Sequence, residues 1–209
     1  DQEKSSSFEK SAKQFGIKII DKKKFVLNND PRVREKNDLN FLTYSKKYNA
    51  VFIADTDREF SFSVPYDTMR ISAVIGASGL KPEAWHWSYL RHGAPQVNGR
   101  FERIYNRRMT SRDWSGWVAV KSLTEAIVRT RSTKYIVLSK YLVSDEFSLD
   151  GSKGTSLNFR KWNRQLRQTI LLSTDNWVTK VAPLDGFIHS KNNLDTIGVD
   201  EKYSSCKEK

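Results

Sequence analysis

Apolar residues near the start of the chain repeat first with a helical and then with an extended period. Phe8, Ala12 and Phe15 follow one another at spacings of four and three, which predicts an amphipathic helix over residues 7–15. The isoleucines and the Phe-Val-Leu run that come next predict a strand over residues 17–27. A helix followed by a strand is typical of a chain that alternates α and β elements.

Two later runs of consecutive apolar residues predict the strands of a parallel sheet. They span residues 50–54 and 73–76, and neither alternates with polar residues, which is the pattern of strands covered on both faces. Asn-Asn-Asp-Pro at 28–31 predicts a turn, with Pro31 suited to the first position of a helix. A polar loop over residues 55–69 lies between the two strands. This order of elements predicts a parallel sheet with helices on its faces.

The middle of the chain is predicted to be mainly helical. Helices are expected over residues 81–93, 101–108, 110–131 and 135–143. The clearest start is at Thr110, because Thr110 and Asp113 have the spacing of a capping box, in which each side chain binds the backbone amide of the other. Arg129 and Arg131 place positive charge at the end of the same helix, where the helix dipole favours it.

The last third of the chain changes to short strands. A turn-rich junction over residues 147–154 precedes predicted strands over 157–160, 167–173 and 177–181. Thr-Asp-Asn at 174–176 separates the last two strands and predicts a β-hairpin. The chain after Pro183 is polar and is expected to be loosely ordered.

The charge of the chain raises the possibility of a nucleic-acid partner. The 209 residues include 36 Lys and Arg against 24 Asp and Glu, a formal net charge of +12, and basic residues gain affinity by releasing counterions from phosphate. Apart from Lys22, the two lysines after it and a looser series over residues 100–112, the positive charges are scattered among acids. The sequence contains neither of the two common glycine-rich phosphate-binding patterns, Gly-x-x-x-x-Gly-Lys-Ser/Thr and Gly-x-Gly-x-x-Gly. We therefore interpret the charge as a solvated basic surface and expect no nucleic acid as a partner.

Other residue types set further bounds. The single cysteine, Cys206, excludes a disulfide within the chain and leaves open a partner outside it. The histidines at 86, 92 and 189 are too dispersed to indicate a zinc site. No apolar run approaches the length of about 18 residues that a membrane span needs, so no membrane insertion is expected. The chain begins at Asp1, without a signal-peptide pattern and in a helix that no strand precedes, which suggests that it was cut from a longer protein.

One acidic segment could bind a cation. Asp55, Asp57 and Glu59 directly follow the apolar run that ends at Ala54, and ligands of open α/β sheets bind beyond the carboxyl ends of strands. If the segment is extended, alternate spacing places all three carboxylates on one side, where hard cations find oxygen ligands. The EF-hand pattern is not met, so a solvated loop with turn-forming aspartates is the competing interpretation. Whether a metal binds there stays open.

Trp-His-Trp at 85–87 is a second candidate, since aromatic rings at a cleft stack on flat ligands. Two rings at positions i and i+2 cannot share one helix face, so one is expected in the core and the other exposed or at an interface. His86 is expected to form hydrogen bonds rather than to bind metal. No Gly-x-Ser-x-Gly elbow and no Ser/His/Asp constellation is recognisable, so we predict no catalytic residue, no enzyme activity and no cofactor.

Short motifs spread over nearly the whole chain resemble one group of proteins. They are Asn-Asp-Pro-Arg at 29–32, the segment 51–60, Val-Pro-Tyr at 64–66, Ala-Trp-His at 84–86, Arg-Phe at 100–101, Met-Thr at 109–110, Asp-Trp at 113–114 and Leu-Asp-Thr at 194–196. The group is the type I periplasmic substrate-binding proteins of ABC transporters that are associated with PQQ-dependent alcohol dehydrogenase systems. Residues 117–126 and 147–159 resemble the long return helix and the late crossover of the wider class, which includes branched-chain amino-acid binding proteins.

The resemblance implies a bilobal α/β protein with a ligand cleft between its lobes, a parallel sheet flanked by helices, and a first lobe that is incomplete or missing here. It assigns residues 1–95 to the second lobe, 96–150 to helices that return to the first lobe, 151–185 to strands that complete the second lobe, and 186–209 to a polar tail. The long helix is then expected to expose a face meant for the missing lobe.

The function that the resemblance implies is that of a transport component rather than an enzyme. It would capture a small molecule or ion in the cleft by hinge closure and deliver it to the membrane subunits of an ABC transporter in the periplasm, with a signal peptide upstream of this chain. An alcohol-derived acid, the quinone cofactor and a metal ion remain open as cargo. The candidate ligand-binding residues, chosen by strand-end position and motif membership, are Asp55, Asp57, Glu59, Tyr66, Trp85, His86 and Arg100.

Two alternatives belong to other functional classes. One is a basic nucleic-acid-binding domain, which predicts DNA affinity that falls steeply with salt. The other is a cation-sensing binding protein that uses the loop of Asp55, Asp57 and Glu59.

Overall fold

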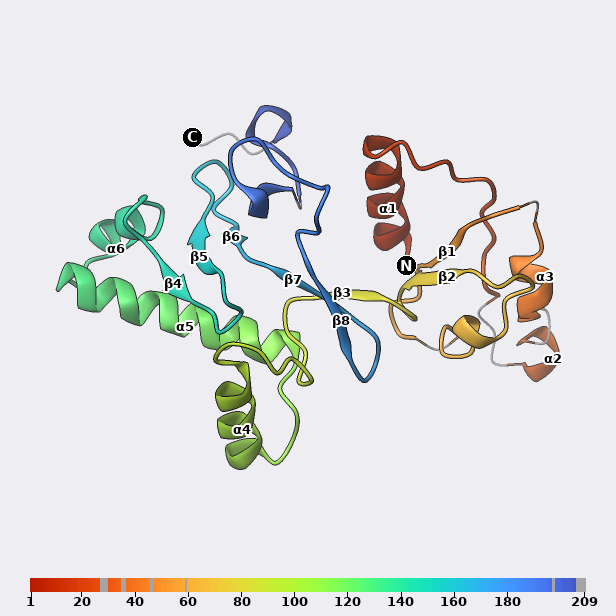
Figure 1. Ribbon diagram of the computed structural model, residues 1–209, viewed down its shortest axis with the longest axis horizontal. Helices are drawn as coiled ribbons and strands as arrows, with labels where there is room; N and C mark the ends of the chain where they lie inside the picture. The colour runs from red at the N-terminus through yellow and green to blue at the C-terminus, as the bar shows by residue number, and fades with distance from the viewer. Residues whose placement is uncertain (27–29, 35–36, 46, 59, 197, 206–209) are drawn as a thin grey trace. The chain divides into compact units, whose positions relative to one another are not determined.

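The chain forms two compact units, residues 1–81 and 82–209 (Figure 1). The computed structural model describes residues 1–26, 30–34, 37–45, 47–58, 60–196 and 198–205. Each unit has a hydrophobic core of its own, so each is described by itself.

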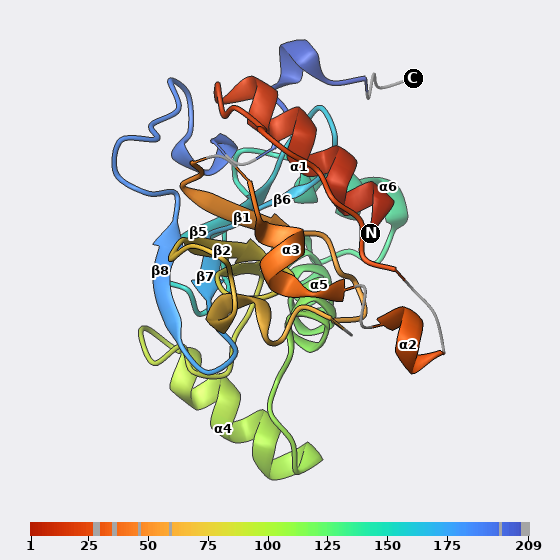
Figure 2. The same ribbon diagram turned by 90° about the vertical axis from the view of Figure 1, so that its right-hand side faces the viewer.

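The first unit combines short helices with a two-stranded sheet. Its described elements are α1 (Gln2–Gln14), α2 (Pro31–Arg34), α3 (Leu39–Thr43), β1 (Ala50–Ile53), the 3₁₀ helix η2 (Val64–Tyr66) and β2 (Ala73–Gly76). Strands β1 and β2 run parallel, with Ala50 opposite Ala73 and Ile53 opposite Gly76. Helix α1 packs on the sheet through Phe8, whose ring stacks on Phe52 of β1 at a centroid distance of 3.8 Å; Figure 2 shows this helix next to β1.

The core of the first unit is small. Its buried residues are Ile53, Val64, Val74 and Ala77, with Phe25, Leu39 and Val51 packed against them. The residues of β1 and β2 were predicted to be buried throughout, but in each strand only one residue is. A sheet of two strands covers only part of its own surface, which explains why the remaining positions stay partly or fully exposed.

The second unit holds most of the regular structure. Its described elements are β3 (Lys81–Glu83, which begins at the last residue of the first unit), α4 (Ala94–Tyr105), α5 (Ser111–Thr130), α6 (Tyr135–Leu142), β4 (Leu149–Asp150), β5 (Ser156–Phe159), β6 (Leu166–Arg167), β7 (Ile170–Ser173), β8 (Val178–Ala182) and the 3₁₀ helices η3 (Asn193–Asp195) and η4 (Glu201–Tyr203). The strands form two sheets of three, ordered β3-β7-β8 and β4-β5-β6. The pairs β4–β5, β5–β6 and β7–β8 are antiparallel.

The core of the second unit is larger and rich in aromatic residues. Its buried members are Trp85, Tyr89, Ala94, Met109, Trp114, Val118, Phe147, Leu149, Leu157 and Leu171. At its centre the ring of Trp85 stacks on that of Trp114, 6.0 Å between centroids and 10° between planes. Helix α5 supplies Trp114 and Val118 to this core, and β5 and β7 supply Leu157 and Leu171, so helix and strands are packed by the same side chains.

Close packing explains why two positions of the segment 147–159 are occupied by glycine. A Cβ on Gly154 would collide with the His92 ring, and Gly154 has φ +79°, where a side chain is strained. A Cβ on Gly151 would collide with Leu157, and the carbonyl of Gly151 accepts a hydrogen bond from Trp114 Nε1 at 3.1 Å. These glycines let the junction pass close to the aromatic core.

Several sequence predictions are confirmed. Helices occur where 7–15, 110–131 and 135–143 were predicted, and the parallel pair of strands and the hairpin β7–β8 are present. The capping box at the start of α5 is formed in both directions: Thr110 Oγ1 accepts from the amide of Asp113, and Asp113 accepts from the amide of Thr110.

Other predicted elements are wrong. No strand forms over residues 17–26, which find no strand partner among the described residues, and Ile17 and Ile20 are exposed; residue 27 lies outside the described residues. The helix predicted over 81–93 is replaced by β3 and a series of turns, because side chains bind its backbone: Ser111 pairs with both backbone groups of Trp85. Of the short helix predicted over 101–108, residues 101–105 are helical, as the second half of α4, which runs from Ala94 to Tyr105.

Two residues of the tail are packed inside the second unit. Leu194 and Asp195 of η3 are buried, although the polar composition after Pro183 suggested a loose segment. The buried position of Asp195 depends on partners far away in the chain, as described below, and composition does not reveal them.

The fold class is therefore mixed α/β. Strands β1 and β2 form a parallel pair, and the pairs β4–β5, β5–β6 and β7–β8 are antiparallel. None of the described helices combines the length and the apolar character that a membrane crossing requires.

Candidate functional site

The predicted ligand-binding residues are divided between the two units. Asp55, Asp57 and Tyr66 belong to the first unit, and Trp85, His86 and Arg100 belong to the second. Glu59 lies outside the described residues. Each group is therefore considered in its own unit.

The acidic loop of the first unit does not have the extended form that the cation interpretation required. Asp55 is buried, and its Oδ2 accepts hydrogen bonds from the amides of Phe60 and Ser61, both at 3.0 Å. Arg58 has φ +61°, so the segment is not extended, and Asp57 is exposed while Asp55 is not. The extended segment on which a shared side of the carboxylates depended is not formed, because the amides of Phe60 and Ser61 turn back onto Asp55. The described residues hold no cluster of His, Cys, Asp or Glu suited to a metal ion.

Trp85 and His86 are parts of the fold of the second unit. Trp85 lies in the core, and its Nε1 donates to Asn98 Oδ1 at 2.9 Å. His86 is buried, its Nδ1 lies 2.8 Å from Ser88 Oγ, and Ser88 Oγ accepts from the amide of Val178. The prediction of one core Trp is confirmed by Trp85, and His86 forms hydrogen bonds as predicted.

Three predicted residues stay accessible. Asp57, Tyr66 and Arg100 are exposed, and Tyr66 has 90% of its surface in solvent. They are the predicted residues that a ligand could reach without rearrangement of the described core.

The basic series over 100–112 is partly engaged in local contacts. Arg107 forms a bidentate pair with Asp113, with both N–O distances at 2.7 Å. Hydrogen bonds from Arg107 and then from Thr110 hold the pKa of Asp113 well below its usual range. The guanidinium of Arg108 lies 3.5 Å from the centroid of the Trp87 ring, which is close enough for a cation–π contact.

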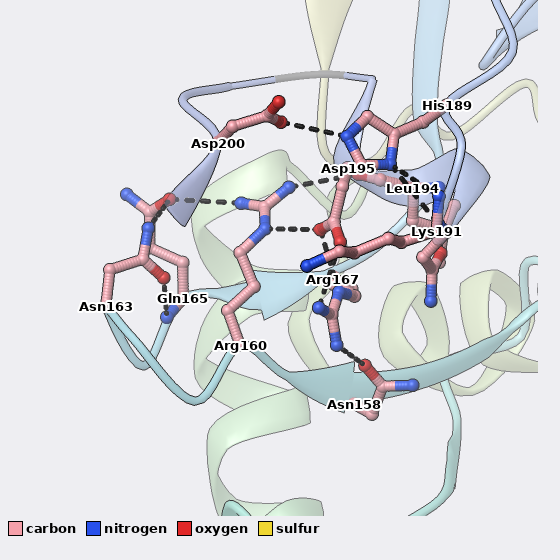
Figure 3. Close-up of polar contacts among 11 residues, drawn as sticks. Asn158, Arg160, Asn163, Gln165, Arg167, His189, Lys191, Leu194, Asp195 and Asp200 are labelled. Carbon is pink, nitrogen blue, oxygen red and sulfur yellow. Dashed lines mark hydrogen bonds and ion pairs between the residues drawn. The ribbon is translucent and has the colours of Figure 1, made fainter. Parts of the chain in front are cut away.

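The best-built polar cluster of the described structure was not predicted. Asp195 of η3 accepts hydrogen bonds from Arg160 Nε and Arg167 Nε, both at 2.7 Å on Oδ1, and from Arg167 Nη2 at 2.9 Å on Oδ2 (Figure 3). The Asp195 side chain is 4% exposed. A single carboxylate thus receives two guanidinium groups inside the second unit.

The two arginines form further hydrogen bonds. Arg160 donates to Gln165 Oε1 at 3.1 Å and to the carbonyl of Leu194 at 3.0 Å. Arg167 donates to Asn158 Oδ1 at 3.1 Å. Burial would raise the pKa of Asp195, but the hydrogen bonds from Arg167 and Arg160 outweigh it and lower the pKa below its usual value. Removing one partner from such a buried cluster is costly, since a charge is left uncompensated.

A histidine forms a separate set of hydrogen bonds within the tail. His189 Nε2 lies 2.9 Å from Asp200 Oδ1, and His189 Nδ1 accepts from the amides of Lys191 and Asn192 (Figure 3). Asp195 joins η3 to Arg160, directly after β5, and to Arg167 of β6, whereas the His189–Asp200 pair lies within the tail.

Lys153 is a second unpredicted feature. It is 2% exposed, and its Nζ donates to the carbonyls of Ala84 and Thr169 and to Gln168 Oε1, at 2.9, 2.6 and 2.6 Å. The same Nζ lies 4.0 Å from the centroid of the Trp114 ring. Burial lowers the pKa of Lys153 to about 7. Three oxygen acceptors match the three N–H bonds of the ammonium form, so Lys153 ties the junction before β5 to the residues before β7.

Sequence reasoning could have reached these residues only in part. Asp195 and Lys153 lie inside motifs that carried the resemblance, Leu-Asp-Thr at 194–196 and the segment 147–159. Nothing in the local pattern connects Asp195 to Arg160 and Arg167, which come 35 and 28 residues earlier.

A scan against protein-family models, a search of curated proteins and a search of solved structures each find no match for this chain.

Proposed function

We propose that this chain is part of a substrate-binding component of an ABC transporter linked to PQQ-dependent alcohol oxidation. It captures a small ligand and delivers it to the membrane subunits without chemical change. The type I periplasmic-binding-protein fold, hinge closure on the ligand and a periplasmic location belong to this proposal.

The main support for the proposal is that motif residues in the second unit pack together in the structure. Motifs that are far apart in the sequence supply Trp85, Met109, Trp114 and Leu157 to one core, and Asp195 to one buried cluster. Motif residues that serve one shared framework support a common fold with the proteins they resemble. The exposed apolar side chains of α5 and α6, among them Val120, Val128 and Ile136, also agree with the expected packing face.

The alternatives gain less support. The cation-sensing hypothesis needs the Asp55 carboxylate, whose Oδ2 accepts two backbone hydrogen bonds. The nucleic-acid hypothesis rests on a basic series in which Arg107 is paired with Asp113 and Arg108 covers Trp87. A DNA fragment in the binding assay addresses this second alternative directly.

Isothermal titration calorimetry tests the proposal. The panel is Ca²⁺, a lanthanide ion, ethanol, acetate, PQQ and a short DNA duplex at low salt. The proposal predicts saturable binding of one of the small ligands and none of DNA. Saturable DNA binding that falls with salt, or no binding of any small ligand, would contradict it.

Variants of the accessible residues locate the binding. Arg100→Ala is matched by Arg103→Ala on the same helix, and Tyr66→Ala by Tyr44→Ala in the same unit; all four side chains are exposed. A loss of affinity of about tenfold or more is expected for Arg100→Ala or Tyr66→Ala and not for the controls. Equal affinity in all four variants would remove these residues from the site.

A further inference from the structure

The second unit contains a pocket that the predicted ligand-binding residues do not line. Its volume is about 580 Å³, within the range of small-molecule sites. The lining residues are Thr155, Ser156, Asn158, Thr169, Val181, Ala182, Pro183, Asn192, Asn193 and Leu194. The start of β5, the residue before β7, the end of β8 and η3 therefore meet around one space.

The lining has a defined chemistry. It contains hydroxyl groups from Thr155, Ser156 and Thr169, amides from three asparagines, and aliphatic side chains, but no charged side chain. The charged side chains nearby form hydrogen bonds with other parts of the protein. Arg167 binds Asp195 and Asn158, and Lys153 binds backbone and amide oxygens. Such walls suit a neutral ligand that has both hydroxyl groups and C–H surface.

Thr169 points to a missing hydrogen-bond partner. It is only 5% exposed, and its Oγ1 is buried without a hydrogen-bond partner among the described residues. Its carbonyl is used separately, as an acceptor for Lys153 Nζ. A buried hydroxyl without a partner is unfavourable, and a ligand hydroxyl next to it would remove that cost, since a hydroxyl both donates and accepts.

Two amides of the lining are held in fixed orientations. Asn158 Oδ1 accepts from Arg167 Nη1 at 3.1 Å, and Asn192 Oδ1 accepts from the amide of Leu194 at 3.0 Å. With both oxygens engaged, the NH₂ groups are the parts of these side chains left to donate to a ligand. Fixed donors of this kind favour a ligand that offers acceptor oxygens.

We propose that this pocket binds a small neutral polyhydroxy compound, a polyol or monosaccharide, whose hydroxyl groups bind Thr169, Asn158 and Asn192. The aliphatic side chains of Val181 and Leu194 contact its C–H surface. The proposal concerns a pocket within the second unit and does not depend on the proposed transport function.

Nuclear magnetic resonance of the ¹⁵N-labelled chain tests this proposal with D-glucose, D-xylose and erythritol as probes and D-gluconate as a charged comparator. Saturable shifts of the backbone amides around Ser156, Thr169 and Asn193 are expected with at least one neutral probe, and weaker binding with gluconate. No saturable shift with any neutral probe, or equally tight binding of gluconate, would overturn the proposal.

Thr169→Val separates ligand binding from stability. The variant keeps the shape of the side chain and removes a hydroxyl that has no partner, so the melting temperature is expected to stay unchanged or to rise. Affinity for the neutral probe is expected to fall about tenfold. Thr124→Val is the matched control, because its hydroxyl binds Val120 on α5, outside the pocket. Unchanged affinity in Thr169→Val would contradict the proposed role of this hydroxyl.

A second variant fills the pocket. Asn193 is exposed on η3, and Asn193→Trp places a large ring at the edge of the space. Loss of the probe-induced shifts with an unchanged circular dichroism spectrum is expected. Binding that persists at full affinity would place the probe elsewhere and overturn the proposal.

Discussion

The two units of the chain differ in what holds them together. Among the described residues, the core of the first has four buried members around a two-stranded sheet, and that of the second has ten, including two stacked tryptophans. The second also contains the buried side chains of Asp195, which binds two arginines, and of Lys153, which binds three uncharged oxygens. Burial of apolar area scales with stabilisation, so the second unit is expected to be the more stable one.

The comparison changes the interpretation of the motif residues. Trp85, His86 and Asp55 were predicted to bind ligand, yet the first two support the core of the second unit and Asp55 holds a turn in the first. Residues that carry a family resemblance can serve the fold, and the ligand then depends on residues that remain accessible.

The largest expected effect is on the aromatic core. Trp114→Ala removes the stack with Trp85 and the hydrogen bond to Gly151, and is expected to destabilise the second unit by about 3–5 kcal/mol. Urea unfolding followed by circular dichroism measures the change. Trp177, which is 57% exposed, provides the control: Trp177→Ala is expected to cost less than about 0.5 kcal/mol. Equal costs for both variants would contradict the assigned core.

The next effect concerns the buried carboxylate. Asp195→Asn leaves Arg160 and Arg167 without a negative partner and is expected to cost about 3 kcal/mol, at the low end for a buried pair because the amide oxygen still accepts. Asp145→Asn is the control, since Asp145 pairs with Lys161 at the surface and such pairs contribute about 0–1 kcal/mol. A cost as small as that of the control would show that the cluster does not stabilise the unit.

A pH effect is expected from Lys153. Burial lowers its pKa from 10.5 to about 7, so above pH 7 the unfolded chain binds a proton that the folded chain has lost. Stability therefore rises with pH between about 7 and 10, by up to about 1.4 kcal/mol per pH unit from this group. Lys153→Met is expected to remove that rise when urea unfolding is repeated across the range. The same slope in both proteins would contradict a buried, shifted lysine.

The smallest effect is expected in the first unit. Asp55→Ala removes the acceptor for the amides of Phe60 and Ser61 and is expected to cost about 1 kcal/mol, as for the loss of a helix cap. Asp57→Ala, at an exposed position, is expected to change stability by less than about 0.5 kcal/mol. Hydrogen exchange of the loop amides measures both, and a larger effect for Asp57 would reverse the assigned roles.

Local signals predicted the elements that depend on neighbours in the sequence. Thr110 and Asp113 marked the start of α5, and the apolar runs marked β1 and β2. Prediction failed where distant residues decide the structure: Ser111 binds the backbone of Trp85 in place of a helix, and residues 17–26 find no strand partner among the described residues.

The same distinction applies to the candidate site. Asp55 was chosen because it follows a strand, but its position in the sequence could not show that its carboxylate accepts hydrogen bonds from the loop amides. The pocket next to Thr169 combines four segments between Thr155 and Leu194, and no spacing rule connects them. Only the packed structure brings these hydroxyl and amide groups together.

Native-state hydrogen exchange tests the contrast between the units most directly. The account predicts that amides of α5, β5 and β7 exchange last, with a free energy of opening that Trp114→Ala lowers, and that amides of β1 and β2 exchange earlier and do not respond to that variant. Equal protection of β1 and β7, or an equal loss of protection in both on Trp114→Ala, would contradict it.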